Sequence, residues 1–209
     1  MPIWHAIGQQ LQNPRGILGV LTGMLMRVVN ATPNHMAVEA LEIEPRDRIL
    51  ELGFGPGHAI RLMVPKTPAG FVYGIDQSAV MLQQAAARNR AAIRENRVRL
   101  YQAQFENLPF ADASFDKILA VNVVYFWADA PAVMREIRRV LRPGGRFCIY
   151  ATERATMRNW KFAGSQTHRL YDAAALTLAL RQAGFEGSQI SVRKIRLAAG
   201  VQGLLATVS

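Results

Sequence analysis

The sequence contains a single cysteine, Cys148, among 209 residues. One thiol cannot form an internal disulfide or supply a multi-cysteine metal site, and its apolar neighbours indicate a small buried side chain. The four histidines are scattered without the i,i+4 spacing of a metal-binding pair: His5, His35, His58 and His168. We therefore predict that the protein holds no metal ion.

The sequence also lacks a hydrophobic run long enough to cross a membrane. The longest apolar stretch, Gly16–Val29, covers about 14 residues, whereas a spanning helix needs ~20. It has neither the basic leader nor the small-residue cleavage site of a secretion signal. We predict a helix that packs on the core or covers a site; a lid that contacts an apolar substrate or a membrane surface is the alternative. The expected location is the cytoplasm.

Acidic residues are scarce, because 15 Asp and Glu stand against 25 Lys and Arg, for a net charge of +10. Such an excess can indicate binding to nucleic acid or to an anionic surface. The basic residues are spread along the chain, however, and the densest run, Arg88–Arg99, includes Glu95 and no aromatic residue. We predict a solvated basic surface with no nucleic-acid partner, and an anionic partner is the alternative.

Internal repeats and low-complexity segments are absent as well, so nothing in the composition divides the chain. With 209 residues, half of them apolar, one domain can bury a sizeable core. We predict a single domain over residues 1–209, with an N-terminal helical cap over residues 1–42 and an α/β core over residues 43–209. Within the cap, Pro33–Leu41 is expected to be helical, with Thr32 as its N-cap.

The chain is organised around a glycine-rich segment at residues 49–60. An apolar strand runs into three glycines at alternate positions, Gly53, Gly55 and Gly57, and an apolar helix follows. Glycines permit positive φ and a close approach of ligand to backbone, and the N–H groups at a helix start face such a ligand. A dinucleotide site would need glycine where this chain has His58. A purely structural turn is the alternative to a ligand-binding one.

A second strand is predicted over Phe71–Asp76, closing on an acid 19 residues after the last glycine of the turn. A carboxylate at the end of the second strand, about 20 residues beyond the glycines, can accept hydrogen bonds from both ribose hydroxyls of a nucleoside. Capping of the next helix together with Ser78 is the alternative role for Asp76. That helix is predicted over Ala79–Arg90, with Met81 near its start.

Three motifs resemble class I S-adenosylmethionine (SAM) methyltransferases. The run Glu51-x-Gly53-x-Gly55-x-Gly57 is similar to the first motif of that family, and Val-Leu-Arg-Pro-Gly-Gly-Arg at residues 140–146 is typical of it. Leu-Pro-Phe-x-Asp-x-Ser-Phe-Asp at residues 108–116 resembles the small-molecule methyltransferases, including the ubiquinone/menaquinone C-methyltransferase-like group.

The resemblance implies S-adenosylmethionine as the cofactor and S-adenosylhomocysteine as its product. It also implies a Rossmann-like α/β fold, a seven-stranded mostly parallel sheet with helices on both faces and an antiparallel C-terminal hairpin strand. The remaining strands are expected at Val98–Gln102, Phe115–Val121, Gln189–Ile195 and Val201–Val208.

Cofactor contacts follow from the same resemblance. Asp76 is expected to bind the ribose, and His58 to line the methionine end of the pocket. Where the family has Gly-Asp-Ala beside the adenine, this chain has Ala-Gln-Phe, and the Gln104 carbonyl can still accept from the adenine amine. The predicted cofactor residues are Glu51, Gly53, Phe54, Gly55, Gly57, Asp76, Gln77, Met81, Gln104, Phe105 and Asn122.

The acceptor is expected beyond the strand Phe115–Val121, because ligands of open α/β sheets bind outside the carboxyl ends of strands. Asn122 follows without the Pro-Pro of several amine methyltransferases, which argues against methylation of a nucleobase or of glutamine. Tyr125, Phe126 and Trp127 either form an aromatic wall near the sulfonium or belong to the core.

The resemblance also implies that the polar segment Arg154–His168 covers the substrate. The predicted substrate residues are Tyr125, Trp127 and His5, and no histidine is singled out as a general base. We expect an enzyme, a SAM-dependent methyltransferase with a small, fairly apolar acceptor. The alternatives are a methyltransferase of nucleic acid or protein, and a SAM-fold protein that binds without catalysis. Peripheral contact with a membrane is compatible with the sequence, and no oligomeric state is indicated.

Overall fold

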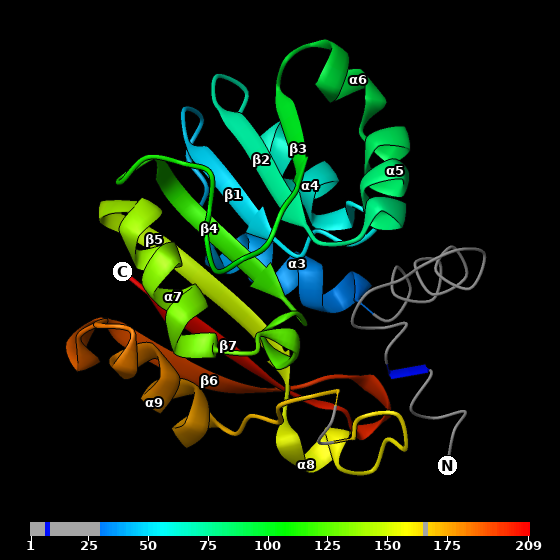
Figure 1. Ribbon diagram of the computed structural model, residues 1–209, viewed down its shortest axis with the longest axis vertical. Coiled ribbons are helices and arrows are strands. Elements are labelled where there is room, and N and C mark those ends of the chain that lie inside the picture. The colour runs from blue at the N-terminus through cyan, green and yellow to red at the C-terminus, as the bar shows by residue number, and fades with distance from the viewer. Residues whose placement is uncertain (1–6, 9–29, 165–166) are drawn as a thin grey trace.

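A computed structural model describes residues 7–8, 30–164 and 167–209. Its centre is one seven-stranded sheet (Figure 1) of order β3-β2-β1-β4-β5-β7-β6. Strand β7 runs antiparallel to β5 and β6, and the other neighbouring strands are parallel. The strands are β1 (Arg48–Leu52), β2 (Phe71–Asp76), β3 (Val98–Gln102), β4 (Phe115–Val121), β5 (Leu141–Thr152), β6 (Ile190–Arg196) and β7 (Gln202–Val208). This arrangement confirms the predicted fold class.

Helices cover both faces of this sheet (Figure 1). The α-helices are α3 (Ala31–Ala40), α4 (His58–Met63), α5 (Ala79–Arg88), α6 (Arg90–Arg94), α7 (Ala130–Val140), α8 (Arg154–Met157) and α9 (Ala173–Gln182). Short 3-10 helices are η1 (Val64–Lys66), η2 (Val124–Phe126), η3 (Gly187–Gln189) and η4 (Ala198–Gly200). Among the described residues, no helix has the length and apolar character that a membrane span requires. The predicted helix at Gly16–Val29 lies outside those residues.

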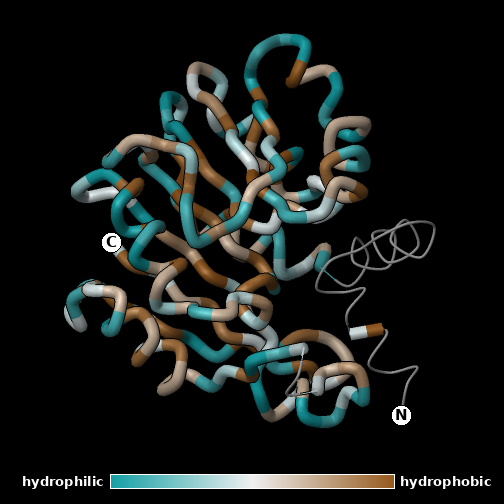
Figure 2. Tube along the Cα trace, viewed as in Figure 1, coloured by the Kyte–Doolittle hydropathy of each residue, from teal (hydrophilic) through white to brown (hydrophobic). Residues whose placement is uncertain are grey.

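The core is divided by the sheet into two layers, because successive side chains of a strand point to opposite faces. On β1, Leu50 and Leu52 pack with α7 and α9, whereas Ile49 packs with α3, α4 and α5. Cys148 of β5 belongs to the second layer, where burial raises the pKa of its thiol to about 12 and leaves it unreactive. Figure 2 shows hydrophobic colours along the central strands and hydrophilic colours in the loops at their ends.

Helix α3 begins two residues earlier than predicted. The structure has Asn30 at the N-cap and Ala31 as the first helical residue, so the prediction of Thr32 as N-cap is wrong. No side chain caps this helix end. Pro33 is still tolerated near the start, because the first N–H groups of a helix have no intrahelical acceptor.

The predicted helix over residues 79–90 is divided in two at Asn89. The Nδ2 of this side chain donates to the Ala85 carbonyl at 2.9 Å and to the Gly57 carbonyl at 3.1 Å, which ties the end of α5 to the glycine turn. At the other end of α5, the Ser78 hydroxyl accepts from the Met81 backbone N–H at 3.3 Å as the N-cap. The helix is therefore held at both ends beside the turn.

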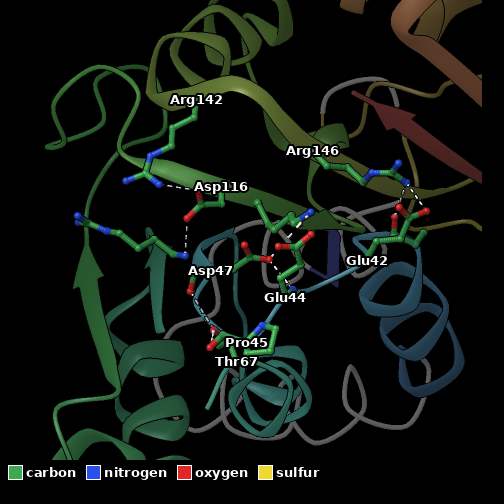
Figure 3. Close-up of polar contacts among 11 residues, drawn as sticks. Glu42, Glu44, Pro45, Asp47, Thr67, Asp116, Arg142 and Arg146 are labelled. Carbon is green, nitrogen blue, oxygen red and sulfur yellow. Dashed lines mark hydrogen bonds and ion pairs between the residues drawn. The ribbon is translucent and has the colours of Figure 1, made fainter. Parts of the chain in front are cut away.

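The amino ends of the strands are joined by ion pairs and hydrogen bonds (Figure 3). Asp116 accepts from the Arg48 backbone N–H at 2.7 Å and pairs with Arg142 at 2.6 Å. Arg146 of β5 pairs with Glu42 at 2.7 Å, which attaches the end of α3 to the sheet. Polar residues at this edge are therefore structural, and the opposite, carboxyl edge carries the pocket.

Candidate active site

A pocket opens at the carboxyl ends of β1, β2 and β4, where the strand order reverses and open α/β sheets bind their ligands. Its walls come from the glycine turn, the start of α3, the end of β2 and the segments after β3 and β4. It is lined by Asn30, Asn34, Glu51, Gly53, Phe54, Gly55, Pro56, His58, Asp76, Gln77, Met81, Phe105, Val121, Asn122, Val123 and Phe126. All predicted cofactor residues except Gly57 and Gln104 are in this set.

The three glycines of the turn have positive φ values of 70°, 50° and 74°, which disfavour any side chain. Their surroundings differ. A Cβ on Gly53 would lie 2.4 Å from Val123, and one on Gly57 would lie 2.8 Å from Ala85, so these two glycines permit close packing inside the protein. A Cβ on Gly55 would meet nothing within 4 Å. Among the three, Gly55 is the position where the backbone borders open space in the pocket.

Asp76 ends β2 with its carboxylate held by backbone N–H groups. Its Oδ2 accepts from the Gly55 N–H at 2.9 Å and its Oδ1 from the Ser78 N–H at 2.9 Å. Burial raises the pKa of this carboxyl to about 6, against the opposing effect of those hydrogen bonds. The Gln77 backbone also contributes a hydrogen bond, and a carboxylate with about four acceptor sites keeps capacity for a ligand hydroxyl. The helix-capping and ligand-binding roles of Asp76 are therefore compatible.

Glu51 lies at the end of β1 and is 2% exposed. Its Oε2 is buried and has no hydrogen-bond partner among the described residues. Desolvation, with a smaller contribution from the nearby Asp76, raises the pKa of this carboxyl well above its usual value. Two acids that share one buried pocket favour a ligand that carries positive charge.

Gln104 lies beside the pocket and is paired with another predicted residue. Its Oε1 accepts from the Gln77 Nε2 at 2.8 Å, and Gln77 itself lines the pocket. Met81 and Phe105, both buried, complete this end. The structure therefore gathers four predicted residues at the β2 and β3 side, with Gln77 in the lining position and Gln104 behind it.

Asn122 occupies the end of β4 with a left-handed backbone, φ 52°, which asparagine tolerates better than most residues. Its Nδ2 donates to the Asn30 Oδ1 at 2.8 Å, across 92 positions of sequence. Its Oδ1 accepts from the Tyr125 hydroxyl at 2.7 Å and from the Thr152 N–H at 3.1 Å. These bonds fix the side chain at the edge of the pocket.

Of the three aromatic residues predicted to form a wall or to belong to the core, one lines the pocket. Tyr125 and Trp127 are buried in the core and are not among the residues that line the pocket, whereas Phe126 is. Tyr125 and Phe126 belong to the tight turn η2, and Trp127 is its C-cap. Successive side chains of such a turn diverge by about 120°, so Phe126 points to the pocket while its neighbours do not. His5, the third predicted substrate residue, lies outside the described residues.

Comparison with known proteins identifies the family. A methyltransferase-domain family matches residues 50–149. The uncharacterised methyltransferase YdaC of Bacillus subtilis is 31% identical over 180 residues, which cover 85% of this chain and 92% of that protein. The chain belongs to the class I SAM-dependent methyltransferases.

One further similar sequence and one similar solved structure agree with this family. The ubiquinone/menaquinone biosynthesis C-methyltransferase UbiE of Geotalea daltonii is 32% identical over 114 residues, 54% of this chain and 48% of that protein. A solved complex of the Haloferax volcanii Trm112 methyltransferase activator with a methyltransferase contains a chain of TM-score 0.73. That match covers 89% of this chain and 92% of the other at 21% identity, and it supports the fold.

The pocket residues that the motifs did not indicate come from α3 with its N-cap and from the end of β4 with the segment after it: Asn30, Asn34, Val121 and Val123. Asn30 and Asn34 are four positions apart, so they share one face of the helix, but nothing in the sequence says that this face meets the pocket. His58 lines the pocket as expected.

The cofactor of this family, SAM, joins a nucleoside to a methionine through a positively charged sulfur, and the residues present fit it. Gly55 leaves room against the backbone, Asp76 keeps free lone pairs, and the unpartnered Glu51 Oε2 suits a cation. When bound, SAM supplies a methyl group that an acceptor displaces from the sulfur in line. In the part of the chain that the structure describes, no group of three His, Cys, Asp or Glu is placed to hold a metal.

Proposed function

We propose that this methyltransferase transfers the methyl group of SAM to a small, fairly apolar acceptor that binds beside Phe126. The observation that supports this is a row of aromatic rings leading from the pocket. The Phe126 ring lies 4.8 Å from that of His168, His168 lies 6.1 Å from Phe162, and Phe162 lies 5.4 Å from Trp160. We call Phe126, His168, Phe162 and Trp160 the aromatic row.

The aromatic row presents an apolar surface in spite of its histidine. Burial lowers the pKa of His168 to about 4, so the ring is neutral near pH 7, and its Nδ1 is engaged with the Thr167 hydroxyl at 2.9 Å. Three of the four residues come from the segment that the family resemblance assigns to substrate covering. A Cβ on Gly8 would lie 2.7 Å from the Phe162 carbonyl, so Gly8 also packs on this segment.

In this proposal the cofactor residues keep their predicted roles. Asp76 binds the ribose, the Gly55 backbone borders the cofactor, and Met81 at the start of α5 rests on the nucleoside. Asn122, fixed at the end of β4, borders the reacting methyl group. The enzyme then acts by holding sulfur and acceptor in line and by excluding water, and no general base is assigned.

The similarity to a protein named for ubiquinone/menaquinone C-methylation supports an apolar acceptor, though it covers about half of each chain. The net charge of +10 instead favours the second candidate, a methyltransferase of nucleic acid or protein. None of the described residues that line the pocket is Lys or Arg, which supports the first candidate. We propose a cytoplasmic enzyme of one domain.

Methyl transfer from radiolabelled SAM tests the proposal. The purified enzyme is given an organic-solvent extract of small molecules, total RNA and DNA, or total protein, and the label is followed into each pool. Label in the small apolar pool is expected; label confined to nucleic acid or protein would establish the second candidate. Stoichiometric SAM binding with no labelled product in any pool would favour a non-catalytic role.

Variants then connect activity to the aromatic row. Phe126→Ala and Phe162→Ala should raise the KM for the acceptor by about tenfold or more, because each removes a buried aromatic contact worth ~1–3 kcal/mol. The dissociation constant of SAM should change little for Phe162→Ala. Phe71→Ala, at an exposed phenylalanine at the amino end of β2, is the matched control. Unchanged acceptor KM in both test variants would refute the site.

A further inference from the structure

The hydrogen bonds of Asn122 determine which end of its amide remains for a ligand. Its Oδ1 meets the backbone N–H of Thr152 at 3.1 Å, and a backbone N–H can only donate. This contact therefore identifies the atom as the amide oxygen and excludes the flipped amide. The Thr152 hydroxyl donates to the same oxygen at 3.3 Å.

Tyr125 also uses this oxygen. Its hydroxyl donates to the Asn122 Oδ1 at 2.7 Å and accepts from the Thr152 N–H. Tyr125 is buried, and burial raises the pKa of its hydroxyl, so the proton that it donates stays in place at neutral pH. An amide oxygen has two lone pairs. Both are used inside the protein, so the Asn122 oxygen is not available to accept from a ligand.

The amide nitrogen of Asn122 keeps one hydrogen for a ligand. An amide NH2 group has two donors, and among the described residues Asn30 accepts one of them, at 2.8 Å. Asn122 lines the pocket at the end of β4, and its backbone N–H donates to the Tyr150 carbonyl of β5 at 2.8 Å. Side chain and backbone are therefore both held in place, and the second N–H is what Asn122 offers to the pocket.

The polarity of this contact decides which acceptor it suits. An amine that receives a methyl group directs its lone pair at the methyl carbon, so only its hydrogens are left for the protein. Asn122 would face those hydrogens with a donor, and buried donors without an acceptor are costly. An oxygen has two lone pairs and can accept from the amide N–H. The described lining contains no Lys or Arg, so a neutral donor has to bind such an oxygen.

We infer that Asn122 selects the acceptor by donating from Nδ2 to one of its oxygen atoms, so that this methyltransferase acts on an apolar hydroxyl or carbonyl compound and not on an amine. The inference rests on the proposed function, in which Asn122 borders the reacting methyl group. An oxygen that receives the methyl keeps a second lone pair for this hydrogen bond, and an acceptor carbon can carry such an oxygen on its neighbouring carbon. Tyr125 and Thr152 are the positioning residues, because they fix the orientation of the amide.

Three ligands with one ring skeleton test this selection without any turnover: 2-naphthol, 2-naphthylamine and naphthalene. Each is titrated by fluorescence into the protein saturated with S-adenosylhomocysteine, at pH 7, where both substituents are neutral. We expect 2-naphthol to bind about three- to tenfold more tightly than naphthalene, the value of one neutral hydrogen bond. 2-Naphthylamine should bind no more tightly than naphthalene.

Asn122→Asp reverses the contact while it keeps the shape of the side chain. Aspartate tolerates the left-handed backbone, and its oxygens can still accept from Tyr125 and Thr152. This variant should lose the preference for 2-naphthol and bind 2-naphthylamine about three- to tenfold more tightly than naphthalene. Asn96→Asp is the matched control, because Asn96 has the same left-handed backbone, φ 54°, but is exposed and precedes β3. It should leave all three affinities within about twofold.

Tyr125→Phe is a second variant, which removes one donor to the Asn122 oxygen and should reduce the preference for 2-naphthol over 2-naphthylamine about threefold or more. Equal affinities of the wild type for the three ligands, or tighter binding of the amine, would overturn the inference and leave the acceptor site in place. So would an unchanged preference in both variants, or a tenfold loss of S-adenosylhomocysteine affinity in Asn122→Asp, which would assign the amide to the cofactor. Wild-type protein that binds S-adenosylhomocysteine but none of the three ligands would instead refute the apolar acceptor site of the proposed function.

Discussion

The two buried acids of the pocket make the stability of the ligand-free protein depend on pH in an unusual direction. Burial raises the pKa of Asp76 from 3.8 to about 6, so the folded state binds this proton more tightly than the unfolded state does. Between these two values the folded protein carries the proton and the unfolded chain does not. Stability therefore falls as the pH rises from 4 to 7, opposite to the behaviour of a carboxylate in an ion pair.

The magnitude follows from the difference between the two pKa values. Each tenfold change in proton affinity corresponds to about 1.4 kcal/mol, so Asp76 contributes ~3 kcal/mol of stability well below pH 4. Of this, ~2.5 kcal/mol remains at pH 4 and is lost by pH 7. The side chain is almost completely buried, so solvent screening reduces this little. Glu51, whose pKa is also raised, acts in the same direction.

Urea unfolding of the wild type and of Asp76→Asn at pH 4, 5, 6 and 7 isolates this contribution, because the other titrating groups are common to both proteins. The stability of the wild type relative to the variant should fall by about 2.5 kcal/mol between pH 4 and pH 7. Ribose hydroxyls donate better to the ionised acid, so SAM should stabilise the wild type more at pH 7 than at pH 5. A difference between the two proteins that is constant with pH, or that rises with it, would refute the reasoning.

Four other substitutions test separate parts of the structure. Asp76→Ala should abolish measurable SAM binding by calorimetry while thermal unfolding stays cooperative; retained affinity would mean that the ribose lies elsewhere. Gly57→Ala should destabilise the fold in urea by about 2–4 kcal/mol, from backbone strain plus the clash with Ala85, whereas Gly55→Ala should cost about 1–2 kcal/mol but weaken SAM binding. Arg139→Ala should cost about 2–3 kcal/mol, because the guanidinium bonds Glu136, Asp112 and two carbonyl oxygens; an unchanged urea midpoint would contradict this.

The local pattern of the sequence was sufficient to predict the strands of the sheet. Apolar runs such as Phe71–Asp76 and Phe115–Val121 match β2 and β4 residue for residue, because a strand buried on both faces has few alternatives. The helix after the glycine turn, α4, ends before Pro65, since proline supplies no N–H to continue it. The Leu-Pro-Phe-x-Asp motif is typical of the family, but its role in this structure is to stabilise the fold. Arg139 of α7 donates hydrogen bonds to the Leu108 and Phe110 carbonyls of the motif.

The pocket residues that lie in a motif were predicted from the sequence. Those that another part of the chain supplies were not. Motif spacing placed Glu51, Gly55 and Asp76, because the backbone itself carries those residues to the carboxyl ends of adjacent strands. It could not tell that Phe126 lines the pocket while Tyr125 and Trp127 do not. That choice depends on the orientation of one tight turn against its neighbours.

The sequence alone determined the family, the cofactor and the order of strands and helices, because these follow from short-range patterns in the chain. Tertiary structure alone decided which glycine borders the ligand, which aromatic ring reaches the pocket, and that Asn34 of the N-terminal helix faces it. Each of those depends on contacts between segments far apart, such as the bond between Asn30 and Asn122 across 92 positions. Such contacts are formed by packing, which no local pattern of residues records.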